Sequence, residues 1–247
     1  MQAIKQLYRE NYTGESVVTN LTMKNGQWDF QREWIPNAIT NIHTTSQAII
    51  IGGGPSWQHP TQGFDISHIA RHKGGLYGVD KLQTYGTNGL YKKFKFDFLV
   101  IDDDHVNEIL ETDYCTDNIV YAHANAIIDN PGKFYLIPQD PSWNSGTIAT
   151  YLACFDGHTK IFLLGFDGKH GEDLFYEKAM HQVFTLYPTV EFVRVCLTPE
   201  YYMPESWKYQ VNLRQITFRD FVIEADIGDR KSTRLNSSHS QQSRMPS

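Results

Sequence analysis

The chain has 247 residues, of which 40% are hydrophobic and 13% aromatic, enough apolar material for one large domain with or without an extension. Its formal net charge of −6 argues against a nucleic-acid-binding surface and against binding to anionic membranes. No apolar run approaches the roughly 20 residues that a membrane-spanning helix needs.

Residues 1–46 form a polar lead-in. They begin with MQAIKQLYRE, which lacks the apolar segment of a signal peptide, and end with REWIPNAITNIHT, which is predicted to form an amphipathic helix. The three cysteines are far apart and form no CxxC pair; they are Cys115, Cys154 and Cys196. Reduced structural thiols and the lack of a signal peptide predict a cytoplasmic protein.

Short apolar runs recur between residues 47 and 196, as is typical of strands that are buried on both faces of a sheet. The runs are Ala48–Ile51, Leu76–Val79, Phe96–Ile101, Ile119–Tyr121, Phe134–Ile137, Ile161–Leu164 and Val190–Val195. Helical patterns lie between several of them, including Thr147–Asp156 and the segment between Glu172 and Pro188. This alternation predicts an α/β, Rossmann-like domain with a mainly parallel sheet and helices on both faces. Ligands of such domains bind beyond the carboxyl ends of the strands, so the residues that follow each strand are the candidate site.

The first predicted strand ends in a glycine-rich turn, within the sequence AIIIGGGPSW. Gly52, Gly53 and Gly54 permit close approach of a ligand to the backbone, and Ser56 can cap the next segment or donate to a phosphate. The turn is not a dinucleotide fingerprint, because GxGxxG needs glycine where Trp57 stands. It is not a P-loop either, because no Gly-Lys-Ser/Thr follows. A turn whose glycines serve only packing is the alternative.

Acidic residues follow the second and third predicted strands. Asp80 ends the second strand, where an acid often holds a ribose hydroxyl, although a solvated helix cap is equally consistent. Asp102, Asp103 and Asp104 follow the third strand, with His105 beside them. Adjacent carboxylates repel one another unless a cation neutralises them, and their oxygens suit Mg²⁺ that bridges to substrate phosphates. We favour a metal or substrate contact slightly over solvated loop acids.

Three further candidates follow the later strands. Asn144, Ser145 and Gly146 open a helix, whose free N–H groups form an anion site or are simply capped. Asp167 stands at the end of the sixth predicted strand. His170 follows in a glycine-flanked loop, where a histidine could act as general acid or base, although a lone surface histidine usually has no such role.

The C-terminal part divides into two segments. Residues 197–228 are an extension that fits a lid, a hairpin or a truncated second element. Residues 229–247, DRKSTRLNSSHSQQSRMPS, resemble a translated sequencing adapter, so we interpret them as an artefactual disordered tail. They contain four of the 22 Lys and Arg residues and one of the 28 Asp and Glu residues. The rest of the chain therefore has 18 basic and 27 acidic residues, a net charge of −9.

The motif order over much of residues 47–196 resembles the 6-hydroxymethylpterin pyrophosphokinase (MptE-like) family. Members have a strand with a Gly-Pro-Ser turn and two further strands that each end in Asp; here these are IIIGGGPSW, GLYGVDKL and FDFLVIDDDH. A Ser-containing helix start and a Gly-x-Asp follow, here within NSGTIATYLACFDGHTKIFLLGFDG. The resemblance implies diphosphate transfer from ATP to a hydroxymethyl group, with Mg²⁺ at Asp102, Asp103 and Asp104 and with Asp103 as a catalytic residue.

The chain is also similar to the bacterial sialyltransferases of glycosyltransferase family 42, which have a Gly-Asn-Gly-Pro-Ser turn, a Thr-Ser-Gly helix start and a strand that ends in Gly-x-Asp. That resemblance implies a CMP-sugar donor and His170 as the base. Two departures stand against it. The asparagine of the turn is Gly53 here, and the asparagines after strands two and three appear as Asp80 and as Asp102 or Asp103. Aspartate fits a metal and the pyrophosphokinase-like pattern, whereas asparagine suits a metal-independent sugar-nucleotide site.

We therefore expect a nucleotide-dependent transferase that binds a small-molecule nucleotide and an acceptor. The glycine turn and the helix start would bind phosphates, Asp80 would contact ribose or base, and the three adjacent aspartates would hold Mg²⁺ or the acceptor. A nucleotide-binding module without catalytic activity is the alternative from another class, because fold does not determine function. The sequence leaves a homo-oligomer open.

Overall fold

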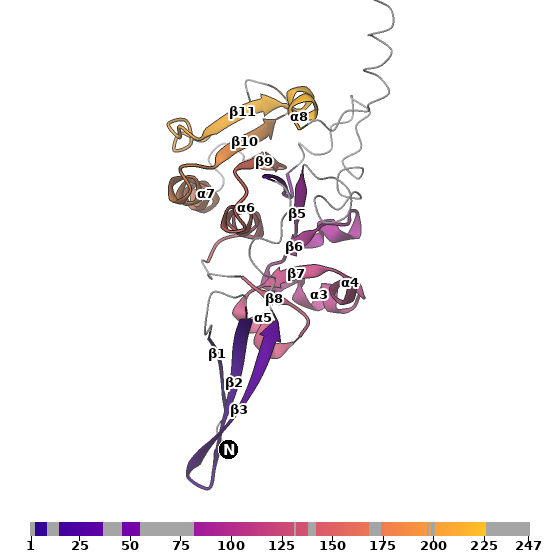
Figure 1. Ribbon diagram of the computed structural model, residues 1–247, viewed down its shortest axis with the longest axis vertical. Coiled ribbons are helices and arrows are strands. Elements are labelled where there is room, and N and C mark those ends of the chain that lie inside the picture. Colours follow the sequence, from indigo (N-terminus) through magenta and orange to yellow (C-terminus); the bar gives the residue numbers. More distant parts are fainter. Residues whose placement is uncertain are drawn as a thin grey trace, which may run out of the picture.

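The computed structural model describes residues 3–8, 15–36, 46–54, 82–130, 132–137, 142–167, 174–196, 198 and 201–225. Its centre is an eight-stranded sheet with the order β11-β10-β9-β4-β5-β6-β7-β8 (Figure 1), in which every neighbouring pair is parallel. The strands are β4 (Gln47–Ile51), β5 (Gln83–Thr87), β6 (Phe98–Val100), β7 (Ile119–Ala122), β8 (Tyr135–Leu136), β9 (Lys160–Leu164), β10 (Glu191–Cys196) and β11 (Leu213–Thr217). The protein therefore has the expected α/β, Rossmann-like fold.

Helices connect most of these strands. The α-helices are α3 (Val106–Leu110), α4 (Tyr114–Asp117), α5 (Ala124–Asp129), α6 (Ser145–Phe155), α7 (Leu174–Leu186) and α8 (Phe218–Glu224), and the 3₁₀-helices are η2 (Asn88–Lys92) and η3 (Asp103–His105). Among the described residues, no helix has the length and apolar character that crossing a membrane requires.

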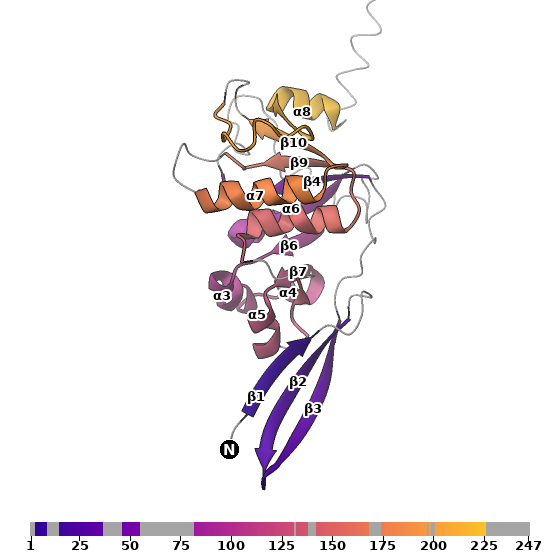
Figure 2. The same cartoon turned by 90° about the vertical axis from the view of Figure 1, so that its left-hand side faces the viewer.

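The side chains of the central strand alternate between two hydrophobic cores. Ile49 and Ile51 of β4 belong to the core that α3, α5 and α8 cover, whereas Ala48 and Ile50 belong to the core under α6 and α7. Figure 2 shows α6 and α7 side by side over one face of the sheet. Complete burial of an isoleucine side chain stabilises a protein by about 1.5–3 kcal/mol. This double-sided burial explains why apolar runs predicted these strands.

Six of the seven predicted strands overlap a strand of the sheet; the strand predicted at Leu76–Val79 lies outside the described residues. β5, whose sequence QTYGT is more polar and was not predicted, pairs with β4 on the side away from β9. The polar groups of Thr84 in β5 have a partner outside the strand: the backbone N–H and Oγ1 of Thr84 donate to Asp97 Oδ2 over 2.9 and 3.0 Å. Gly86 is needed because an added Cβ would lie 2.3 Å from the Phe96 ring.

The N-terminal region differs from the helical lead-in that its pattern suggested. It contains three antiparallel strands in the order β1-β2-β3, namely β1 (Ala3–Tyr8), β2 (Glu15–Lys24) and β3 (Gln27–Pro36). Asn25 and Gly26 join β2 to β3 with φ angles of 50° and 78°, as the tight type I′ hairpin turn requires. This Asn-Gly pair was the hairpin signal in the sequence. Residues 37–45, the end of the expected helix, lie outside the described residues.

The sheet continues beyond residue 196, into the region expected to be a separate extension. β11 pairs with β10, and α8 packs Phe218 and Phe221 into the core. Thr217 and Asp220 form a capping box at the start of α8, with the Asp220 N–H donating to Thr217 Oγ1 over 3.2 Å. Residues 213–224 are therefore an integral part of the α/β domain.

Charged side chains tie these last elements to the sheet at its amino edge. Glu191 Oε1 accepts from Arg214 Nε over 2.7 Å and Glu191 Oε2 lies 3.5 Å from Lys160 Nζ, while Glu224 pairs with both cations.

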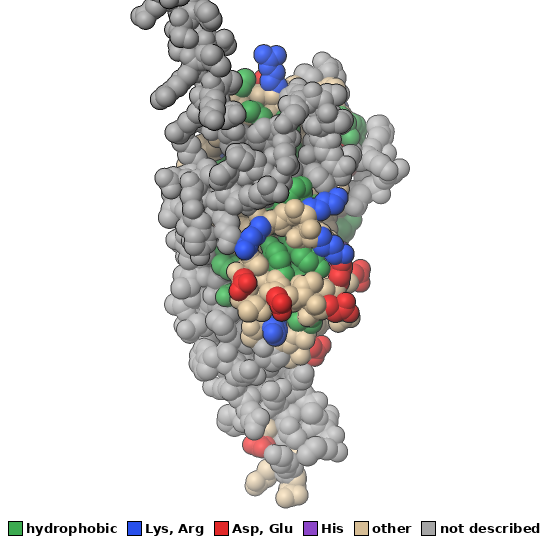
Figure 3. Space-filling view, turned by 90° about the vertical axis from the view of Figure 1, so that its right-hand side faces the viewer, with side chains coloured by type: hydrophobic (Ala, Val, Ile, Leu, Met, Phe, Trp, Pro, Cys, Tyr) green, Lys and Arg blue, Asp and Glu red, His purple; other side chains and the backbone are tan. Residues whose placement is uncertain are grey.

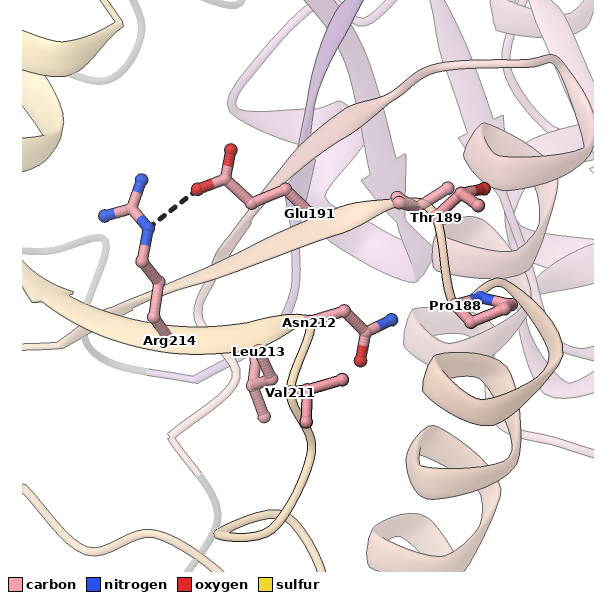
Figure 4. A pocket seen from close by; sticks show the side chains of 8 residues that line it. Pro188, Thr189, Glu191, Val211, Asn212, Leu213 and Arg214 are labelled. Carbon is pink, nitrogen blue, oxygen red and sulfur yellow. Dashed lines mark hydrogen bonds and ion pairs between the residues drawn. The ribbon is translucent and has the colours of Figure 1, made fainter.

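A pocket of about 250 Å³ lies beside this network, between the amino ends of β10 and β11 and the end of α7 (Figure 4). This is the opposite edge of the sheet from the predicted nucleotide site.

Candidate functional site

The direction in which successive strands are added to the sheet changes between β4 and β9. From β4 it adds β5 to β8 on one side, and then α6 carries it back to β9, which pairs with the other side of β4. Ligands of open parallel sheets bind at such a switch point, beyond the carboxyl ends of the strands. The predicted segments Gly52–Gly54 and Gly165–Asp167 follow β4 and β9, so both lie at this point.

The two turns are in direct contact. The N–H of Gly52 donates to the Leu164 carbonyl over 2.8 Å, and the N–H of Gly54 donates to the Gly165 carbonyl over 2.9 Å. A Cβ on Gly52 would lie 2.9 Å from the Gly165 oxygen, and one on Gly54 would lie 2.3 Å from Asp167 Oδ2. Real Cβ atoms essentially never come so close. Gly52 and Gly54 are therefore required for packing, as the alternative interpretation of the turn proposed.

Gly53 differs from the glycines on either side of it. It is exposed, and a Cβ built on it meets no atom within 4 Å. The turn thus brings its two outer glycines against the protein itself and presents the middle one outward. Gly53 is the place in the described part of the turn where a ligand can approach the backbone.

The start of α6 is the second predicted anion-binding element. Asn144 is its N-cap and accepts from the Thr147 N–H with its side chain over 2.9 Å, so this asparagine acts as a plain cap. The first N–H groups of a helix have no partner within the helix and, together with the helix dipole, attract anions. The N–H groups of Ser145 and Gly146 are therefore the ones suited to a phosphate, although the Ser145 side chain is buried.

The Phe166 ring connects α6 with the two turns. A Cβ on Gly52 would lie 3.3 Å from Phe166 Cε2, and a Cβ on Gly146 would lie 3.5 Å from Cε1 of the same ring. Phe166 is only 3% exposed. The glycine turn, the turn after β9 and the start of α6 therefore meet around one buried aromatic ring.

A pair of hydrogen bonds between Asn88 and Asp102 links the carboxyl ends of β5 and β6. Asp102 was a predicted site residue, whereas Asn88 was not. Asn88 follows β5 with φ of 46°, and its side chain donates to Asp102 Oδ2 over 2.8 Å. In return the Asp102 N–H donates to Asn88 Oδ1 over 3.0 Å. Thr87 Oγ1 also donates to the Ile51 carbonyl over 3.1 Å, which joins β5 to the end of β4. The signal for Asn88 was an asparagine that precedes a glycine, because Asn tolerates left-handed backbone.

The three adjacent aspartates have different environments. Asp102 is held by Asn88, whereas Asp103 and Asp104 lie in η3 and are exposed. On the side of the molecule that carries α3 and α4 in Figure 1, Asp and Glu side chains stand at the surface close to Lys and Arg side chains (Figure 3). Within the described residues, no group of three or more His, Cys, Asp or Glu side chains could hold a metal ion. Mg²⁺ usually takes one or two carboxylates plus phosphates and water, so its binding here stays a prediction.

Asp167 is brought to the site by the turn after β9. Its side chain is 6% exposed, and its Oδ2 lies against Gly54. The carbonyls of Phe166 and Asp167 accept from Arg194 Nε and Nη2 over 2.9 and 2.6 Å. Arg194 was not among the predicted site residues, although a charged residue between two valines in EFVRVC was a visible signal.

Cys196 ends β10 near this turn and is 1% exposed. Burial raises the pKa of its thiol to about 11, and the nearby Arg194 only partly offsets this effect. A thiol with this pKa is protonated at neutral pH and is not a nucleophile. Burial also raises the pKa of Cys154 and Cys115, and all three cysteines are free, as expected for structural thiols.

Three predicted site residues lie outside the described residues: Ser56, Asp80 and His170. The structure therefore brings together Gly52, Gly53, Gly54, Ser145, Gly146 and Asp167, and it places Asp102 at the neighbouring strand tip.

Comparisons with known proteins add no assignment: no family model matches the chain, and no curated protein and no solved structure matches it.

Proposed function

We propose that this protein is a nucleotide-dependent transferase, with the nucleotide bound at the switch point between β4 and β9. The observation that supports this proposal is the meeting of three segments at that point: the glycine turn, the start of α6 and the turn that ends in Asp167. The phosphates would lie over Gly53 and receive N–H groups from Ser145 and Gly146.

Asp167 would not contact a phosphate directly, because a buried carboxylate beside an anion costs electrostatic energy. A carboxylate at this position suits a ribose hydroxyl or a cation that bridges to phosphate. The nucleotide would therefore bind in one orientation, with its phosphates toward the start of α6 and its sugar toward the Asp167 carboxylate.

In the first version of the reaction ATP donates diphosphate, as the MptE-like resemblance implies. The acceptor hydroxyl oxygen bonds to the β-phosphorus, the bond from that phosphorus to the α,β-bridging oxygen breaks, and AMP leaves. The hydroxyl proton passes to a base or to solvent. Such transfer depends mainly on positioning and charge neutralisation. Mg²⁺ would supply part of that neutralisation, with Asp102 or Asp103 as a protein ligand.

Asn88 favours a second version with a nucleotide sugar as donor. Among the described residues, the strand that follows β4 along the chain is β5, and Asn88 comes directly after it. An asparagine after this strand matches the family 42 sialyltransferase pattern. In this version the acceptor oxygen bonds to the anomeric carbon, the bond from that carbon to the phosphate oxygen of CMP breaks, and His170 takes the proton.

Isothermal titration of the full chain tests the proposal. ATP with Mg²⁺ should bind if the first version holds, and CMP or a CMP-sugar if the second holds. The absence of binding by all of them at millimolar concentration would refute both versions. Binding without turnover of either donor would identify a non-catalytic nucleotide-binding module.

Two variants separate the chemistries. His170→Ala should abolish glycosyl transfer and leave diphosphate transfer largely intact, and Asp103→Asn should do the reverse. Full activity in both variants would show that the assignment of catalytic residues is wrong.

A further inference from the structure

Arg194 is a completely buried cation in β10. Its guanidinium donates to neutral oxygens: the carbonyls of Phe166, Asp167 and Tyr202 over 2.9, 2.6 and 2.6 Å, and the side-chain oxygen of Gln215 over 3.1 Å. Burial of a charge is costly even when its hydrogen bonds are made. Valines stand on both sides of Arg194 in β10. An apolar residue at position 194 would therefore form the strand equally well.

The guanidinium holds two consecutive carbonyls of the turn after β9. Nε and Nη2 bind Phe166 and Asp167 as a planar fork, a geometry that a lysine ammonium cannot reproduce. Gly165 precedes them with φ of 77°, so the turn has a backbone that few residues adopt. The fork thereby sets the position of the Phe166 ring, which Gly52 and Gly146 face, and of the Asp167 carboxylate against Gly54.

The same guanidinium also holds the segment that follows β10, residues 201–207, which we call the strap. Nη1 donates to the Tyr202 carbonyl, and the Arg194 Cζ lies 5.6 Å from the Tyr201 ring and 5.5 Å from the Trp207 ring. Trp207 is fully buried and donates from Nε1 to the Glu177 carbonyl in α7 over 2.9 Å. The strap is thus anchored on α7 at one end and on Arg194 at the other.

We infer that Arg194 is the positioning residue of the nucleotide site: it fixes the turn that carries Asp167 and couples that turn to the strap. It makes no contact with the nucleotide, and it acts through the carbonyls of Phe166 and Asp167. The inference rests on the proposed nucleotide site for its effect on binding, but its effect on the turn can be measured without any ligand.

Two substitutions test this role in the full chain. Arg194→Met keeps the length of the side chain and removes every donor, and Arg194→Lys keeps the charge but not the fork. Arg214→Met, in the neighbouring strand β11 and in ion pairs with Glu191 and Glu224, is the matched control. Amide hydrogen exchange of residues 165–167 and 201–203 is measured first, and then the affinity for ATP with Mg²⁺ and for CMP.

In both Arg194 variants we expect exchange at least tenfold faster in these two segments, with exchange unchanged in β4 and β5. Affinity for the nucleotide that binds the wild type should fall at least tenfold. In an Asp167→Asn background, the Arg194 substitutions should lower nucleotide affinity less than threefold, because Arg194 acts through the turn that carries Asp167. Arg214→Met should change neither readout.

Unchanged exchange in folded Arg194 variants overturns the inference, as does wild-type affinity in them. Failure of both variants to fold also overturns it, because Arg194 would then support the whole fold rather than the turn. If the wild type binds no nucleotide, the proposed function fails, while the exchange data still decide whether Arg194 positions the turn.

Discussion

The hydroxyl of Tyr85 donates a hydrogen bond of 2.6 Å to Asp156 Oδ2 and lies 3.1 Å from His158 Nε2. Tyr85 lies in β5, and the other two residues lie between α6 and β9, so the contact joins segments more than 70 positions apart. All three side chains are buried. Burial raises the pKa of Asp156 to about 6, even though the Tyr85 hydrogen bond lowers it. Burial likewise raises the pKa of Tyr85, and the charge of Asp156 adds to that increase.

Asp156 should make stability depend on pH between about 4 and 6. Because its pKa is higher in the folded than in the unfolded chain, its contribution is fully present below the unfolded value of 3.8 and is lost as pH rises through about 6. The loss amounts to roughly 3 kcal/mol at most. Asp156→Asn, which still accepts from Tyr85, should remove this component. Urea unfolding from pH 4 to 7 measures it as the difference between variant and wild type, and a difference that does not change with pH would contradict the assignment.

Gly54→Ala should destabilise the protein far more than Gly53→Ala. The new Cβ would lie 2.3 Å from Asp167 Oδ2 and 2.6 Å from the Gly165 oxygen, so the two turns must separate. Overpacking of this kind typically costs about 1–3 kcal/mol, whereas an exposed substitution without contacts usually stays within about 0.5 kcal/mol. Thermal unfolding compares the two variants side by side. Equal melting temperatures would show that the turns are not packed as described.

Gly53→Asp should lower nucleotide affinity by at least about tenfold without changing the melting temperature, because a carboxylate over the phosphate position repels the ligand. Added salt should restore part of the affinity. Gly53→Asn controls for size, and Gln182→Glu, on the exposed face of α7, controls for net charge. Titration calorimetry at two salt concentrations is the measurement, and an effect of Gln182→Glu as large as that of Gly53→Asp would refute a local site.

Two variants of Asn88 distinguish a structural role of this residue from a role in nucleotide binding. Asn88→Ala loses both hydrogen bonds and places alanine at φ of 46°, so it should destabilise the fold by about 1–3 kcal/mol. Asn88→Gly keeps the backbone conformation and should cost roughly 1 kcal/mol less. If the donor is a CMP-sugar, the glycine variant should still lose affinity for CMP. Wild-type CMP affinity in a stable Asn88→Gly protein would show that Asn88 has no role in binding the nucleotide.

The sequence by itself determined the class of the fold and the place of most strands along the chain. Strands such as β4 and β9 are covered on both faces, so they must be apolar, and this pattern is visible without any tertiary information. The same holds for the glycine turn after β4 and for the Asn144 cap, since both depend on local backbone geometry. The Asn-Gly pair at residues 25–26 is also a local signal, because both residues tolerate the left-handed backbone of a tight hairpin turn.

Only the tertiary structure decided how the polar residues are used. Within β5, the buried polar groups of Thr84 and Tyr85 find acceptors outside the strand, in Asp97 and Asp156. Likewise, Gly52 and Gly54 serve the turn after β9, while Gly53 alone faces outward. Burying a polar group costs free energy unless its hydrogen-bond partners are in place. For Arg194 most of those partners are backbone carbonyls, which every residue has and which no sequence pattern can mark.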